Sequence, residues 1–177
     1  MMLLVAAYAF VFLVFASMLA IDLRGVIAKG AKPASATSNA FARKTLVIIP
    51  VRGTDLGLQS NLNSIKTQKH ANYDVVVVAD SKNDEAAQVA RKLGMRVTIA
   101  RYACKNCSGK NRAIAYALSK FKNYDVYVIA DSDIKAKPYW LSALLRPLGD
   151  KNTGIATTFP KFVPKDNGFW SYAKMVW

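Results

Sequence analysis

The sequence has few of the side chains that build most metal and redox centres. It contains one histidine, His70, and two cysteines, Cys104 and Cys107. A structural zinc site takes four Cys or His ligands, so this set is too small and too scattered to form one. A thioredoxin-like redox pair is the less favoured alternative for the C-x-x-C spacing. We interpret both cysteines as packing residues and His70 as a surface residue.

Acidic residues are also scarce. Only 11 Asp and Glu accompany 25 Lys and Arg, which gives a formal net charge of +14. This excess suits a polyanion, an anionic membrane surface or a phosphorylated small molecule, and composition does not choose among them. The cations form no recognisable nucleic-acid-binding motif, so we expect no nucleic-acid partner. The 177 residues suffice for one domain with a substantial core.

No charged side chain occurs in the first 21 residues, MMLLVAAYAFVFLVFASMLAI. As a helix with a rise of about 1.5 Å per residue, this run spans roughly 30 Å, the thickness of a bilayer core. A cleaved signal peptide is the alternative. No basic residue precedes the run, however, and it exceeds the roughly 7–15 apolar residues of such signals. We therefore predict a retained transmembrane anchor over residues 1–23.

A segment of small and basic residues follows, from residue 24 to residue 44. Its Gly, Pro, Ser and Thr content is typical of a juxtamembrane linker. Its cations are Arg24, Lys29, Lys32, Arg43 and Lys44. Because basic residues favour the cytoplasmic side of a membrane, we expect a single-pass protein whose domain faces the cytoplasm. The two cysteines then need no disulfide.

From residue 45 the chain alternates between strand and helix patterns. The predicted strands are TLVIIP, YDVVVVAD, MRVTIA, YDVYVIAD and TGIATTF, at residues 45–50, 73–80, 95–100, 124–131 and 153–159. Runs such as Val75 to Val78 are apolar on both faces, which marks strands covered by helices on both sides. The sequence therefore predicts an α/β domain over residues 45–177, with a mostly parallel sheet sandwiched by helices.

An acidic pair ends the strand predicted at residues 124–131. Asp131 and Asp133 flank Ser132, and their side chains point the same way if the backbone stays extended. Two close carboxylates repel unless a cation lies between them, so the pair suits Mg²⁺ held together with substrate phosphates. The alternative is a turn that caps the next helix. A second strand-end acid, Asp80, favours the metal site, because ligands of such sheets bind at the carboxyl ends of strands.

Cationic residues accompany these acids. Arg52 follows the first predicted strand, and Lys110 and Arg112 lie in the first turn of a helix predicted to begin at Ser108 or Gly109. Helix N-termini attract anions. The spacing is not that of a Walker A loop, and a solvated basic helix start is the alternative. Asp84 is interpreted as the N-cap of another helix.

Together these motifs resemble the donor half of a GT-A glycosyltransferase of the inverting family 2 type. The resemblance is closest to the ceramide glucosyltransferase branch. PVRGTD is similar to the P-x-K-G-x-D segment of that branch, VVVVADSKNDEA to its second strand, and VYVIADSDI to its metal-binding D-x-D. The resemblance covers residues 45–177. It implies a Rossmann-like GT-A fold and the transfer of a sugar from a nucleotide-diphosphate donor to a lipid or polyprenyl acceptor.

The resemblance also implies roles for individual residues. The donor, expected to be a UDP-sugar, would contact Pro50, Arg52, Asp80, Lys110 and Asp131, with Asp80 at the base and Arg52 and Lys110 at the phosphates. Asp133 and Asp131 would hold Mg²⁺ or Mn²⁺, with Asp133 as the principal metal ligand.

The same resemblance leaves the catalytic residues unknown. The family's catalytic base Asp and its (Q/R)-x-x-R-W motif have no counterpart in this chain. We therefore expect a domain that is incomplete at its C-terminus, with a second chain as a source of the acceptor half. The alternative is a nucleotide-sugar-binding module or one half of a split enzyme.

Overall fold

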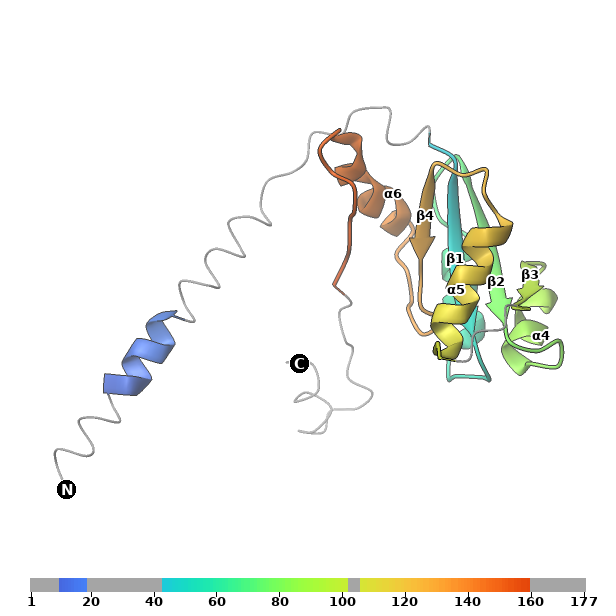
Figure 1. Cartoon of the computed structure of the whole chain (residues 1–177), viewed down its shortest axis with the longest axis horizontal. Coiled ribbons are helices and arrows are strands. Elements are labelled where there is room, and N and C mark those ends of the chain that lie inside the picture. Colours follow the sequence, from blue (N-terminus) through green and yellow to red (C-terminus); the bar gives the residue numbers. More distant parts are fainter. Residues whose placement is uncertain (1–9, 19–42, 102–105, 160–177) are drawn as a thin grey trace, which may run out of the picture. The chain divides into compact units, whose positions relative to one another are not determined.

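The computed structural model describes residues 10–18, 43–101 and 106–159 (Figure 1). The chain divides into two compact units, Met1–Ser35 and Ala36–Trp177. In the first unit, residues 10–18 form an α-helix with exposed apolar side chains such as Phe12 and Phe15. Within the described ranges, no helix combines the length and the apolar character needed to cross a bilayer. Most of the anchor predicted over residues 1–23 lies outside those ranges, and so does most of the linker.

The second unit contains a parallel sheet of four strands, ordered β3-β2-β1-β4 (Figure 1). These strands are β1 (Thr45–Val51), β2 (Tyr73–Ala79), β3 (Arg96–Ile99) and β4 (Val126–Ile129). The first four strands predicted from the sequence are therefore confirmed. From β1 the chain builds outward on one side through β2 and β3, and then returns to place β4 on the other side. The order of strands reverses between β1 and β4.

Helices cover both faces of this sheet, as predicted. They are α3 (Leu58–Lys66), α4 (Glu85–Lys92), α5 (Gly109–Lys120) and α6 (Trp140–Leu145), followed by the short 3-10 helix η1 (Arg146–Gly149). Successive residues of β1 alternate between the two cores, because side chains alternate along a strand. Leu46 and Ile48 pack with Ala113 and Ala117 of α5. Val47 and Ile49 pack with residues of α3, α4 and α6, namely Leu62, Ile65, Ala87, Leu141 and Leu145.

Strand β1 continues one residue beyond Pro50, at which the sequence had predicted its end. Ala130 N–H donates to Ile48 O, so the backbone polar groups of Ile48 point toward β4. Those of Pro50, two residues further on, point to the same side. Pairing between β1 and β4 stops at Ile48. Proline lacks an N–H, but no ladder bond is lost because β4 makes no bond there. The two strands therefore separate at their carboxyl ends.

One expectation for the end of the described chain is corrected. Residues 153–159, predicted as a fifth strand, form no strand. Ile155 is 89% exposed and Phe159 94% exposed, so neither apolar side chain packs in a core. Strand propensity without a partner strand and a buried face does not make a strand. Helix α6 ends at Leu145, two residues before Pro147, and the chain continues into the 3-10 helix η1.

Candidate functional site

A pocket of about 390 Å³ lies at the carboxyl ends of the strands, where β1 and β4 separate. Ligands of parallel α/β sheets bind at this reversal of strand order. The lining comes from β1 and the loop after it, the end of β2, the start of α5 and the turn after β4. Its residues are Pro50, Val51, Arg52, Asp55, Asp80, Gly109, Lys110, Ala113, Asp131, Ser132 and Asp133. Every residue predicted to bind the donor or the metal is among them.

The acidic pair lies in a turn and not on extended backbone. Strand β4 ends at Ile129, and Ser132 and Asp133 belong to the turn that follows. Asn61 Nδ2 of α3 donates to Ser132 O at 3.3 Å, and Asn61 is only 8% exposed. A buried amide from another helix therefore holds the turn that brings Asp131 and Asp133 to the pocket.

Asn61 belongs to a polar stripe that we define as Asn61, Ser64 and Gln68. Asn61 and Ser64 lie three residues apart on one side of α3, and Gln68 follows just after the end of this helix. Ala136 N–H donates to Ser64 Oγ at 2.9 Å, and Gln68 Nε2 donates to Lys137 O at 2.8 Å. The polar stripe thus fixes the whole segment between β4 and α6. Sequence reasoning missed it, although Asn61 and Ser64 recur at helical spacing beside the apolar positions of α3.

Two cations in the first turn of α5 pair with strand-end carboxylates. Arg112 Nη2 lies 2.8 Å from Asp80 Oδ1, and their side chains are 31% and 24% exposed. Arg112 Nε is buried and has no hydrogen-bond partner in the described part of the chain. Lys110 Nζ lies 2.5 Å from Asp131 Oδ1, with both side chains about half exposed. Neither of these two pairs engages Asp133, whose side chain is exposed at the pocket.

The start of α5 lies close to Asp80. Ser108 is the N-cap of this helix, and its Oγ accepts from Asn111 N–H at 3.3 Å. A Cβ atom added to Gly109 would lie 3.1 Å from Asp80 Oδ2, closer than most side-chain carbons tolerate. Glycine at this position therefore allows the helix to approach the carboxylate.

The loop that carries Arg52 is tied to α4. Gly53 has a φ of +66°, the left-handed region that glycine adopts without strain, and its N–H donates to Asp84 Oδ2 at 3.1 Å. The other oxygen of Asp84 accepts from Ala86 N–H at 2.9 Å and caps the helix, as predicted. Thr54 Oγ1 adds a bond of 2.7 Å to Glu85 Oε2. Asp84 thus does more than the sequence indicated, because it also positions one wall of the pocket.

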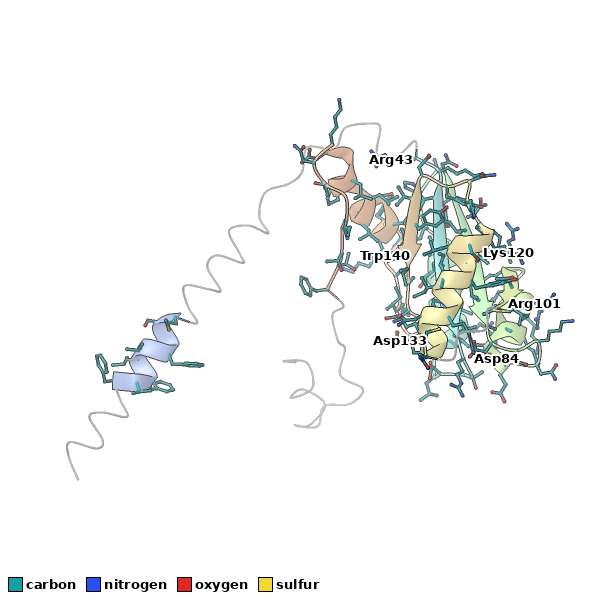
Figure 2. The ribbon with its side chains drawn as sticks, in the orientation of Figure 1. Arg43, Asp84, Arg101, Lys120, Asp133 and Trp140 are labelled. Carbon is teal, nitrogen blue, oxygen red and sulfur yellow. The ribbon has the colours of Figure 1, made fainter. Side chains whose placement is uncertain are left out.

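The donor atoms of the pocket fit a divalent cation that is completed by its substrate. In the described part of the chain, no cluster of three or more His, Cys, Asp or Glu side chains is placed to hold a metal. Asp131 and Asp133 offer carboxylate oxygens only, which Mg²⁺ and Mn²⁺ prefer. Mg²⁺ is commonly bound by one or two carboxylates plus substrate phosphates and water. Figure 2 shows Asp133 at the same end of the domain as Asp84, with Arg43 at the other.

Cys107 differs from expectation, and His70 is less exposed than expected. Cys107 is disulfide-bonded, whereas the sequence reading expected reduced cysteines, and Cys104 lies outside the described residues. His70 is half-buried, with Nδ1 3.2 Å from Ser142 Oγ. Burial lowers the pKa of His70 below its ordinary value. His70 precedes β2, so it stands at the opposite end of the sheet from the pocket.

A parallel α/β sheet whose strand ends carry an Asp-x-Asp turn and neighbouring cations has the architecture of the GT-A class. The sequence profile of Glycosyl transferase family 21 matches residues 2–176. The chain belongs to this glycosyltransferase family, which is the ceramide glucosyltransferase branch that the motifs resembled. No similar sequence is found among curated proteins.

Solved structures share the fold. Glucosyl-3-phosphoglycerate synthase from Mycobacterium tuberculosis, in complex with Mn²⁺, UDP-glucose and phosphoglyceric acid, is 22% identical with a TM-score of 0.55. The match covers 69% of this chain and 47% of that one. Mannosyltransferase PcManGT from Pyrobaculum calidifontis, in complex with GDP-Man and Mn²⁺, is 21% identical with a TM-score of 0.54 over 70% of this chain and 38% of that one. The chain thus spans less than half the length of these structures.

Proposed function

We propose that the chain is the donor-binding part of a membrane-anchored glycosyltransferase that transfers a sugar from a nucleotide-diphosphate sugar to a lipid-type acceptor. One observation carries the proposal: Asp131, Asp133, Lys110 and Arg52 line a single pocket at the strand ends. The carboxylates suit a divalent cation, and the cationic side chains suit a diphosphate. Membership of a glycosyltransferase family supports the reaction type.

Different walls of the pocket would bind different parts of the donor. Asp80, held by Arg112, would accept hydrogen bonds from the base. Arg52, Lys110 and the N-terminus of α5 would bind the diphosphate. Asp133 and Asp131 would hold Mg²⁺ or Mn²⁺, which when bound stabilises the negative charge of the leaving diphosphate. We assign no residue as the catalytic base.

The acceptor and the location belong to the same proposal. The uncharged N-terminal run and the basic segment at residues 24–44 support a single-pass anchor with the domain on the cytoplasmic side. A domain tethered in this way meets acceptors dissolved in the bilayer, such as a glycolipid precursor or a polyprenyl phosphate. Alkaline extraction of membranes tests the anchor: an integral protein stays in the membrane pellet, and release into the supernatant would contradict the proposal.

Calorimetric titration of the full chain in detergent micelles tests the donor site. We expect UDP-glucose to bind in the presence of Mn²⁺ and much more weakly in EDTA. Asp133→Asn should weaken Mn²⁺-dependent binding at least tenfold, because losing even an outer partner of a metal costs about 10–100-fold. Asp150→Asn removes the same charge from an exposed turn outside the pocket and is the control. Binding that is indifferent to EDTA and to Asp133→Asn would contradict the proposal.

A nucleotide-sugar-binding module, or one half of a split enzyme, is the second candidate. It is favoured because the pocket offers groups for a diphosphate and a cation, while no residue that lines it is assigned as a catalytic base. A transfer assay with radiolabelled UDP-glucose and acceptor lipid in liposomes separates the two candidates. Labelled lipid supports the transferase, and Mn²⁺-dependent binding without labelled lipid supports the module.

A further inference from the structure

We propose that Lys110 is an exchangeable counter-ion of Asp131, and that its exchange makes binding of the divalent cation and binding of the nucleoside diphosphate depend on each other. The inference rests on the proposed function and adds to it a coupling between the two ligands. It also gives Lys110 a second role besides contact with phosphate.

The starting point is the ion pair itself. Lys110 Nζ lies 2.5 Å from Asp131 Oδ1, so the ammonium already neutralises a carboxylate that the divalent cation needs as a ligand. An ammonium and a divalent cation repel each other and compete for the same oxygen. A cation that binds alone must therefore displace Lys110 without offering it a new partner.

The charge of the pocket opposes binding of the diphosphate in the absence of the divalent cation. The carboxylates in the lining are Asp55, Asp80, Asp131 and Asp133, and the cations are Arg52 and Lys110, with Arg112 paired to Asp80 beside them. Four negative and three positive charges therefore leave −1. A diphosphate that approaches alone meets this net negative charge. The divalent cation reverses it, and the diphosphate then offers the released Lys110 an anionic partner. Each ligand thus removes an obstacle to the other.

The neighbouring ion pair shows why Lys110 is the exchangeable partner. Arg112 and Asp80 are the more buried pair, and Arg112 Nε is enclosed by protein, so this guanidinium is fixed. Lys110 and Asp131 are 53% and 52% exposed. Exposed ion pairs are weak, and lysine carries its charge on a flexible stem, so the ammonium can move between partners at little cost.

The test compares the Mn²⁺ affinity of the full chain in detergent micelles with and without saturating UDP, using the electron paramagnetic resonance signal of free Mn²⁺. In the wild type, we expect UDP to raise Mn²⁺ affinity at least about fivefold, the lower end of typical coupling between sites. Lys110→Gln should bind Mn²⁺ alone up to about fivefold more tightly, which corresponds to the loss of one exposed ion pair. UDP should then raise its Mn²⁺ affinity much less than in the wild type.

Two further variants separate the exchange from a general effect of charge. Lys110→Arg keeps the cation and should keep most of the coupling. Lys122→Gln removes one exposed cation from the loop before β4, at the far end of that strand from the pocket. It should leave the Mn²⁺ affinity unchanged both with and without UDP. Circular dichroism checks that each variant is folded.

The inference is overturned if Lys110→Gln binds Mn²⁺ alone no more tightly than the wild type. It is equally overturned if Lys122→Gln reproduces the effect, since general electrostatics would then account for it. Failure of the proposed function is read separately, from calorimetry with UDP-glucose. Mn²⁺-dependent donor binding without coupling through Lys110 refutes only the exchange.

Discussion

Replacing Gln68 with alanine removes the side chain that joins α3 to α6. Gln68 is 6% exposed. Its Nε2 donates to Ser64 O and to Lys137 O, both at 2.8 Å, and its Oε1 accepts from Leu141 N–H at 2.9 Å. Leu141 is fully buried, so water cannot readily replace that acceptor. The substitution therefore leaves a buried backbone donor without a partner.

The expected loss of stability follows from these contacts. A buried donor left unsatisfied costs about 1–3 kcal/mol, and the bond to the exposed residue Lys137 contributes about 0.5–1.5 kcal/mol. The free energy of unfolding should therefore fall by about 2–4 kcal/mol in Gln68→Ala. For a unit of this size, one kcal/mol shifts the melting temperature by about 3–5 °C, so we expect a decrease of roughly 10 °C.

Thermal unfolding of the full chain in detergent micelles, followed by circular dichroism, measures this decrease. Gln59→Ala changes an exposed glutamine on α3, the helix that precedes Gln68, and is the matched control. Below the melting temperature, Gln68→Ala should also weaken Mn²⁺-dependent binding of UDP-glucose, because the segment that carries Asp133 is held less firmly. If the Gln68 and Gln59 variants melt within about 2 °C of each other, the reasoning is refuted.

Two other substitutions separate stability from ligand binding. Gly109→Ala should leave the melting temperature unchanged or slightly higher, because alanine suits a helix better than glycine. It should also weaken UDP-glucose binding in calorimetry, because the added Cβ pushes on Asp80 Oδ2. Gly154→Ala, at a glycine with open space around it, should change neither the melting temperature nor the binding. Asp84→Ala should lower the free energy of unfolding by about 1 kcal/mol through loss of the N-cap and should also weaken donor binding through the Gly53 loop. Asp84→Ser restores the cap, so it should recover stability in urea titration but not affinity; full recovery of both would argue against a role for the Gly53 contact.

Much of the fold was predictable, because the spacing of apolar residues along the sequence indicates which faces of each strand and helix are buried. Strand β2 is apolar on both faces, and a strand of that kind requires helices on both sides, which α5 on one face and α3 with α4 on the other provide. The strand order was not predictable, since no local pattern specifies which strand lies beside β1. Residues 153–159 show the limit of propensity, because a strand also needs a partner that the segment itself does not encode.

The candidate site was predictable in its membership but not in its connections. Strand-end positions identified Asp80 and Asp131, since the carboxyl ends of parallel strands meet at one edge. The pairing of Lys110 with Asp131, and of Arg112 with Asp80, depends on where α5 crosses the sheet, and that is decided by packing over the whole domain. The polar stripe was not predictable, because Asn, Ser and Gln are common at exposed positions and only the burial of Asn61 and Gln68 in the folded domain distinguishes them.

The bond from Asn61 to the acidic turn has a practical consequence for protein engineering. The two partners are 71 positions apart in the chain, so the geometry of the turn depends on a helix that lies much earlier in the sequence. A chimera that takes residues 124–141 from a relative would combine the acidic turn of that relative with the α3 helix of this chain. Exchange of metal preference between relatives should therefore succeed only when α3 is transplanted together with the turn.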